Sequence, residues 1–193
     1  MKIDSWFSTP VIYHDFTGPQ LVKIQQEIKV AVEKVKTQPM GNPWGDKTTS
    51  TFKHTEITND IKNYNMVSLE HEIFQLTAEW CNQIKYMGEK FTLQSSWLNF
   101  AEQGGFQFDH KHPGNRISGC YYYQTTGEDG SIRFENPNTY ALAGGFPYDT
   151  INADGVVYKP AVGRLILFPS WLTHRVSINN TSMERISLAF NLL

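Results

Sequence analysis

The chain has 193 residues, of which 40% are hydrophobic, 19% charged and 13% aromatic, and its formal net charge is −2. This composition is typical of a folded globular chain and excludes a disordered one, and the length suits one domain with one core. The small net charge, without a dense basic cluster, argues against a partner held mainly through phosphate contacts, so nucleic acid is not indicated.

The sequence also carries no signal for a membrane or an export route. It contains no run of about eighteen apolar residues, so no membrane span is expected. The opening segment from Met1 to Ser5 has no apolar core of signal-peptide length. The two cysteines, Cys81 and Cys120, are too few for a disulfide scaffold. We therefore expect a reducing, cytoplasmic location.

The first half of the chain carries two helical patterns. Thr17 and Gln20 form a capping-box pattern, and apolar residues then recur at helical spacing as far as Val35. A polar loop rich in Gly and Pro follows over residues 37–51. Ser68 is expected to cap a second helix that ends at Gly88. Its predicted apolar face holds Ile73, Leu76, Thr77, Trp80, Ile84 and Met87.

The second half of the chain is dense in short strand-like segments. Aromatic and β-branched runs alternate with turn residues over 96–100, 117–123, 132–134, 164–168 and 186–191, a pattern typical of a sandwich or barrel. We expect one domain over residues 1–193, with a helical part over about 1–90 and a β core over about 91–193.

Three histidines suggest a metal site. His110 and His112 are two residues apart, and on a strand their imidazoles would share a face while Asp109 and Lys111 point the opposite way. Two such imidazoles need a third ligand from elsewhere, and His174, which follows the strand-like segment 163–169, is the best candidate. Without further signals, a His-x-His pair is more often a partly exposed strand face.

Arg185 and Ser187 would share a strand face by the same period of two. Arginine binds a carboxylate through two parallel hydrogen bonds, and the neighbouring hydroxyl adds another donor. The pair therefore suits a terminal carboxylate placed beyond the histidines. The alternative is a surface arginine paired with Glu184.

Five motifs in order give the sequence a family resemblance. They are His-x-His (110–112), Ser-Gly-Cys-Tyr-Tyr-Tyr (118–123), Phe-Glu-Asn-Pro (134–137), Gly-x-Leu-x-Leu-Phe-Pro-Ser-Trp-Leu-x-His (163–174) and Arg-x-Ser-x-x-Phe-Asn (185–191). Together they resemble the 2-oxoglutarate-Fe(II) oxygenases, and more narrowly a subfamily of short members. The opening segment 6–11 is similar to the start of that subfamily, and the resemblance is densest over 97–191.

The resemblance implies a mainly β fold with flanking helices (α+β), a double-stranded β-helix or jelly roll buttressed by the N-terminal helices. It implies Fe(II), 2-oxoglutarate and O2 as cofactor and cosubstrates, and hydroxylation of an unidentified prime substrate with release of succinate and CO2. His110 matches the first metal ligand and His174 the distal one. Arg185, assisted by Ser187, matches the residue that binds the far carboxylate of 2-oxoglutarate.

Three further residues follow from the resemblance. Asn99, on a preceding strand, is placed like an asparagine that contacts the cosubstrate in some relatives. Tyr121 and Tyr123 share a strand face, and one of them is expected to reach the cosubstrate. The alternative for both tyrosines is aromatic packing inside the sandwich.

The resemblance departs at His112, where the superfamily has Asp or Glu. An imidazole there makes a neutral face of three nitrogens, so the metal complex carries one more positive charge. This strengthens the binding of an anionic cosubstrate, and three histidines suit Zn(II) equally well. Asp109 should face away, whereas Glu135 could reach the metal from another strand. We expect His112 to be the third ligand.

Two other functions are compatible with a jelly roll. A non-enzymatic binding module would hold a structural metal, or none, and would need no carboxylate anchor. A cupin-type metalloenzyme would not use 2-oxoglutarate, but the spacing of a cupin glutamate is not clear here. We also expect lids in the loop 37–51, with Trp44, and in the segment 140–154, and pairing of edge strands into a homodimer.

Overall fold

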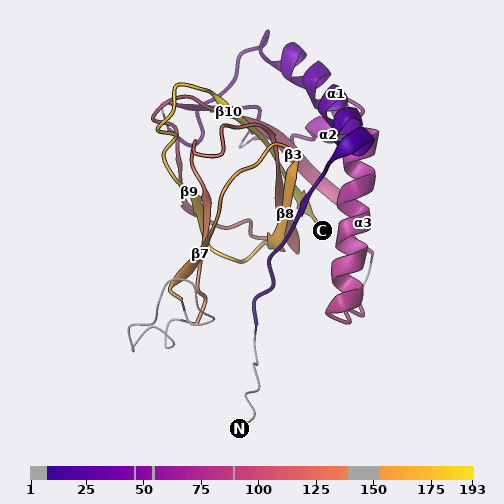
Figure 1. The fold of residues 1–193 in the computed structure, drawn as a ribbon. Coiled ribbons are helices and arrows are strands. Elements are labelled where there is room, and N and C mark those ends of the chain that lie inside the picture. Colours follow the sequence, from indigo (N-terminus) through magenta and orange to yellow (C-terminus); the bar gives the residue numbers. More distant parts are fainter. Residues whose placement is uncertain (1–7, 46, 54, 89, 139–152) are drawn as a thin grey trace.

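Residues 8–45, 47–53, 55–88, 90–138 and 153–193 are described by the computed structural model (Figure 1). In chain order its elements are β1 (Ile12–Asp15), α1 (Gly18–Val35), β2 (Thr48–Ser50), α2 (Asp60–Asn63), α3 (Val67–Gln83), β3 (Leu93–Ala101), β4 (Gln107–His110), β5 (Ile117–Gln124), β6 (Ile132–Glu135), β7 (Gly155–Tyr158), β8 (Arg164–Pro169), β9 (His174–Val176) and β10 (Arg185–Leu192).

Helix α1 confirms the first helical pattern but not its capping box. Thr17 occupies the N-cap position in an extended conformation, and its side chain makes no capping hydrogen bond. A proline in the first turn, Pro19, instead supplies a backbone already restricted to helical φ. The periodic apolar residues are buried, among them Ile24, Ile28 and Val32.

Helix α3 begins one residue before the predicted cap and ends earlier than predicted. The Glu27 carboxylate of α1 accepts hydrogen bonds from the backbone N–H groups of Ser68 (3.0 Å) and Leu69 (3.3 Å), so another helix caps α3. Because the helix ends at Gln83, Ile84 and Met87 are 50% and 95% exposed, and their expected place on the buried face was wrong.

The strands form two antiparallel sheets, as the β-rich second half predicted. The larger sheet has the order β1-β8-β5-β10-β3-β2 and the smaller one the order β4-β9-β6-β7. Figure 1 shows α1 and α3 on one side of the larger sheet and the smaller sheet on its other side. The result is three layers, in which helices cover one face of a two-sheet β core.

Alternate side chains of the larger sheet enter two separate cores. On β10, Ile186, Leu188 and Phe190 pack with the helices in one apolar cluster. A second cluster, which includes Tyr122 and Phe168, fills part of the space between the two sheets. The residues of β10 between the apolar ones therefore point toward the smaller sheet, where the chemistry-bearing side chains gather.

None of the described helices has the length and apolar character needed to cross a membrane. Of the two expected lids, the segment 140–154 falls mostly on residues 139–152, which lie outside the described part of the chain.

Candidate functional site

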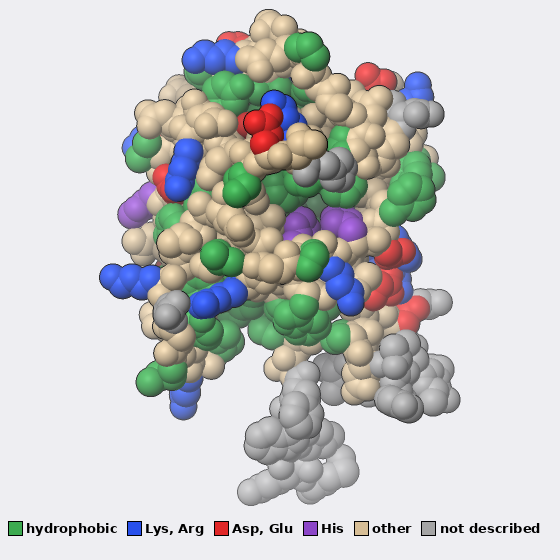
Figure 2. All heavy atoms as spheres, turned by 180° about the vertical axis from the view of Figure 1, so that it is seen from behind, with side chains coloured by type: hydrophobic (Ala, Val, Ile, Leu, Met, Phe, Trp, Pro, Cys, Tyr) green, Lys and Arg blue, Asp and Glu red, His purple; other side chains and the backbone are tan. Residues whose placement is uncertain are grey.

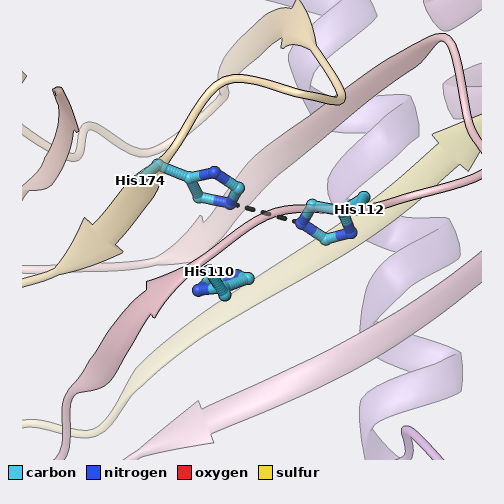
Figure 3. Close-up of side chains that lie close together, drawn as sticks. All are labelled: His110, His112 and His174. Carbon is cyan, nitrogen blue, oxygen red and sulfur yellow. Dashed lines mark hydrogen bonds between the residues drawn. The ribbon is translucent and has the colours of Figure 1, made fainter. Parts of the chain in front are cut away.

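Three histidines from the smaller sheet and the loop after β4 converge on one point (Figure 3). His110 ends β4 and lies opposite His174, the first residue of β9, in the strand register. His112 follows two residues later in the loop. One ring nitrogen of each histidine lies within 4.8 Å of those of the other two. Figure 2 shows histidine side chains recessed in a hollow of the surface.

A β-bulge in β4 aims His110 at this point. Gln107 pairs with Val176 and His110 with His174, so three steps along β4 oppose two steps along β9. Such a bulge turns a strand locally and re-aims its side chains. Phe108 is 68% exposed, and the backbone carbonyl of this residue accepts a hydrogen bond from Nδ1 of His110 (2.7 Å).

Two of the imidazoles are held in the tautomer that a metal requires. His110 and His174 each donate from Nδ1 to a backbone carbonyl, that of Phe108 (2.7 Å) and that of Leu172 (2.9 Å) respectively. The lone pairs of both rings are therefore on Nε2. Burial lowers the pKa of His112 to about 4 and that of His174 to about 3, which keeps both rings neutral and available as ligands at neutral pH.

The spacing of the His112 and His174 nitrogens fits one shared metal ion. Nε2 of His112 lies 3.2 Å from Nε2 of His174. With metal–nitrogen bonds of about 2.0–2.1 Å, two ligands of one ion lie ~3.0 Å apart at a right angle and ~3.3 Å apart at a tetrahedral angle. The donor set suits Fe(II) and Zn(II) alike.

His112 is held from two sides. Its backbone N–H donates to the carbonyl of Ser170 (2.9 Å), and its ring stacks on Trp97 at a centroid distance of 5.8 Å and an interplanar angle of 26°. Ser170 is itself buried and shares a hydrogen bond with Ser118 (2.8 Å), which donates to Asn191 (2.8 Å). A buried polar network thus fixes the backbone to which His112 is attached.

No carboxylate joins the cluster in the part of the chain that the structure describes. Asp109 points away, as expected, and pairs with Arg175 at 3.4 Å. Glu135 pairs with Arg133 (2.8 Å) and Arg175 (3.2 Å), so its alternative role as a ligand is not supported. The candidate metal ligands in the described part of the chain are therefore three neutral imidazole nitrogens, which would add no negative charge to a bound metal ion.

A buried arginine lines the same cavity. Arg185 is 3% exposed, lines the cavity together with the three histidines, and donates from Nη1 to the carbonyls of Asp129 (2.6 Å) and Gly130 (3.1 Å). None of the ion pairs among the described residues involves Arg185. Burial lowers the pKa of Arg185, but a guanidinium stays charged in a protein. Arg185 interacts electrostatically with Asp129 but forms an ion pair with no carboxylate among the described residues, so this buried cation suits an anionic ligand.

Ser187 and Asn99 lie beside this arginine. They are direct partners in the register of β10 and β3, and both line the cavity. Asn99 is 5% exposed, and its Oδ1 accepts a hydrogen bond from Nε1 of Trp44 (3.1 Å). Trp44 belongs to the loop before β2 and also lines the cavity, so this residue of the expected lid lies at the site.

The structure supports the packing alternative for Tyr121 and Tyr123, and the tyrosine between them lines the cavity. Tyr121 is buried in the core shared with the helices, and Tyr123 packs against the same core. Tyr122 lies opposite Ser187 in the register of β5 and β10 and lines the cavity instead. Side chains directly opposite in a sheet share a face, so the position of Ser187 decides which tyrosine points inward.

Sequence reasoning missed four more residues that line or support the cavity. Gln107 lines it from β4. Trp97 lines it from β3, and its buried indole nitrogen has no hydrogen-bond partner among the described residues. Ser118 and Asn191 belong to two of the motifs that carry the family resemblance, but nothing in the sequence assigned them a role. Their network could not be foreseen because its members are far apart in the chain.

Comparison with known proteins assigns the family. Residues 95–191, just over half of the chain, match the family described as "Putative 2OG-Fe(II) oxygenase", and the chain belongs to this family. The protein is thus a 2-oxoglutarate- and Fe(II)-dependent oxygenase, and the family selects this function over the binding-module and cupin-type alternatives. No curated protein matches the sequence.

Solved structures support the fold. A prolyl-4-hydroxylase from Pseudomonas putida is 15% identical, with a TM-score of 0.60, over 96% of this chain and 92% of that one. HygX from Streptomyces hygroscopicus, solved with nickel and 2-oxoglutarate bound, is 12% identical, with a TM-score of 0.63, over 95% and 82%. A viral collagen prolyl hydroxylase from Paramecium bursaria chlorella virus 1 is 14% identical, with a TM-score of 0.56, over 94% of each chain. The jelly-roll prediction is confirmed.

Proposed function

We propose that His110, His112 and His174 hold the iron and that 2-oxoglutarate lies between them and Arg185. With Fe(II), 2-oxoglutarate and O2 bound, the centre would supply hydroxylation of a substrate C–H bond, with conversion of the cosubstrate to succinate and CO2. The observation that carries the proposal is the buried guanidinium of Arg185, which lines the same cavity as the histidines. Among the described residues, no carboxylate forms an ion pair with it.

In this arrangement each residue has a separate task. Arg185, with Ser187 beside it, would bind the far carboxylate of 2-oxoglutarate. Asn99, held by Trp44, has its amide nitrogen left to donate to the cosubstrate. The backbone carbonyls of Phe108 and Leu172 fix the orientation of the His110 and His174 rings. A flexible site would have to order these rings when the metal binds.

Residues 1–193 would act as one domain, because the helices and the larger sheet share a core. A cytoplasmic location is part of the proposal and is supported by two free cysteines, Cys81 and Cys120. A homodimer would form through one of the edge strands, such as β1 or β2 of the larger sheet.

Anaerobic titration tests the site. The purified apo-protein is titrated with Fe(II) and then with 2-oxoglutarate, and the visible charge-transfer band of the chelate is followed. We expect the band in the wild type, its loss in His174→Ala and its weakening in Arg185→Ala. Tyr123→Phe, a change on the helix side of β5, is the matched control and should keep the band. A folded, metal-loaded wild type without the band would overturn the proposal.

A further inference from the structure

A second hollow, the outer groove, adjoins the metal centre. It has a volume of about 400 Å³ and is lined by Trp44, Gly45, Lys47, Thr48, Gly104, Phe106 and Phe108. The cavity between the sheets is much smaller, about 40 Å³. Sites that enclose small molecules measure about 300–1,000 Å³, so the outer groove has the size of a small-molecule site. Trp44 lines both spaces and forms their common wall.

The outer groove offers aromatic faces to solvent. Phe106 and Phe108 meet edge to face, with centroids 4.8 Å apart at 84°, and Phe108 is 68% exposed. The indole of Trp44 is supported from behind by Phe52, at a centroid distance of 5.9 Å and an angle of 29°. Exposed aromatic side chains held in a concave site are typical of binding surfaces for flat apolar groups.

The groove is joined to the metal centre through the bulge of β4. The bulged residue Phe108 turns its side chain toward the groove while its carbonyl holds Nδ1 of His110. The Trp44 ring lies 5.0 Å from the His110 ring. A molecule in the groove would therefore touch Trp44 and Phe108, two of the residues that contact this histidine.

One cation borders the groove. Lys47 is the only ionisable side chain among the described residues that line it, and no acid is among them. An ammonium group at the edge of an aromatic site favours a ligand with a negative charge and selects against a cation.

We propose that the outer groove binds the prime substrate, and that this substrate is a small molecule with a flat aromatic group and an acidic group. The aromatic group would lie on Phe108 and Trp44, with the acidic group toward Lys47. The inference rests on the proposed function, since it names the substrate class of the same centre.

Calorimetry tests the inference: the anaerobic Fe(II)–2-oxoglutarate complex is titrated with 3-phenylpropionate. The neutral amide 3-phenylpropanamide, which keeps the ring but lacks the charge, is titrated for comparison. We expect saturable binding of the acid and about fivefold weaker binding of the amide. Phe108→Ala should weaken binding of the acid about tenfold, and Lys47→Gln should remove the preference for the acid. Ile57→Ala, which truncates a side chain that is 70% exposed elsewhere, and Lys23→Gln on α1 are the matched controls and should bind like the wild type.

The charge-transfer band separates this inference from the proposed function. If the band forms in every variant but 3-phenylpropionate does not bind, or binds Phe108→Ala and Lys47→Gln as well as the wild type, the groove inference fails and the metal site stands. Loss of the band on adding the acid would mean that it displaces 2-oxoglutarate, which also overturns the groove inference. Absence of the band before any acid is added would refute the proposed function.

Discussion

The indole Nε1 of Trp44 donates a hydrogen bond to Oδ1 of Asn99 at 3.1 Å, which joins the loop before β2 to the inner face of β3. This bond fixes which end of the Asn99 amide faces the cavity. Trp44→Phe keeps an aromatic wall but removes the donor, and one such bond contributes about 1 kcal/mol. We expect the KM for 2-oxoglutarate to rise about fivefold with Fe(II) affinity unchanged. Steady-state succinate release and metal titration measure the two values, and an unchanged KM would contradict the role of the pair.

Arg185 should make the stability of the protein respond to 2-oxoglutarate. A ligand at about 100 times its Kd stabilises the folded state by about 2.7 kcal/mol, which raises Tm by roughly 5–10 °C in a chain of this size. We expect this rise in the Fe(II)-loaded wild type and none in Arg185→Gln at the same ligand concentration. Differential scanning calorimetry measures it, and the rise caused by Fe(II) alone serves as the control because both proteins should show it.

Replacing His112 by a carboxylate should weaken the binding of the cosubstrate. His112→Asp lowers the net charge of the metal complex by one, and attraction to the anionic ligand falls with it. We expect Fe(II) to bind and the Kd for 2-oxoglutarate to increase about tenfold. The charge-transfer band gives this Kd. If Kd is unchanged while metal is bound, the charge argument is wrong; His112→Ala, which lacks a third ligand, provides the comparison.

The Asn191 side chain should support both stability and metal binding. It accepts from Ser118 (2.8 Å) and donates to Ser95 (3.0 Å), so Asn191→Ala removes two hydrogen bonds and leaves the buried Ser118 hydroxyl with Ser170 as its remaining partner, at a cost of about 1–3 kcal/mol. Because the network reaches Ser170, whose carbonyl holds His112, Fe(II) affinity should fall as well. Urea unfolding and metal titration measure the two effects, and the exposed Asn180→Ala should change neither.

Gly119 allows three central strands to approach. A Cβ at this position would lie 2.4 Å from the Phe190 ring and 2.6 Å from the carbonyl oxygen of Ile166. Gly119→Ala should therefore destabilise the fold by about 2 kcal/mol or more, because backbone must shift to make room. Gly41→Ala, where the nearest atom is 3.9 Å away, should unfold like the wild type in urea. Equal effects of the two changes would refute the packing argument.

The sequence predicted long elements well and short ones poorly. Helix α1 and strands β3, β5 and β10 each carry several periods of apolar residues, so their patterns were readable. Strands β1, β2, β7 and β9 have three or four residues, too few for a period of two to stand out. Their pairing depends on neighbours far away in the chain, which no local pattern records.

At the candidate site, too, only part of the arrangement could be predicted from local sequence. Histidines and an arginine are rare enough for His110, His174 and Arg185 to be singled out, and the structure brings all three to one cavity. The inward face of β5 was misassigned because an aromatic run such as 121–123 looks the same in either phase. Trp44 was expected only as part of a lid and Trp97 was given no role, because their ring contacts with His110 and His112 arise only from tertiary packing.

The position of β10 affects how the protein is made. In the larger sheet β10 lies between β5 and β3, yet it is translated after both of them. While the ribosome adds the intervening residues, the facing edges of β3 and β5 have no partner, and such edges are prone to pair wrongly. Arg185 and Ser187 enter with β10 itself. The cosubstrate anchor therefore arrives together with the strand that closes the sheet, and a nascent chain cannot acquire it earlier.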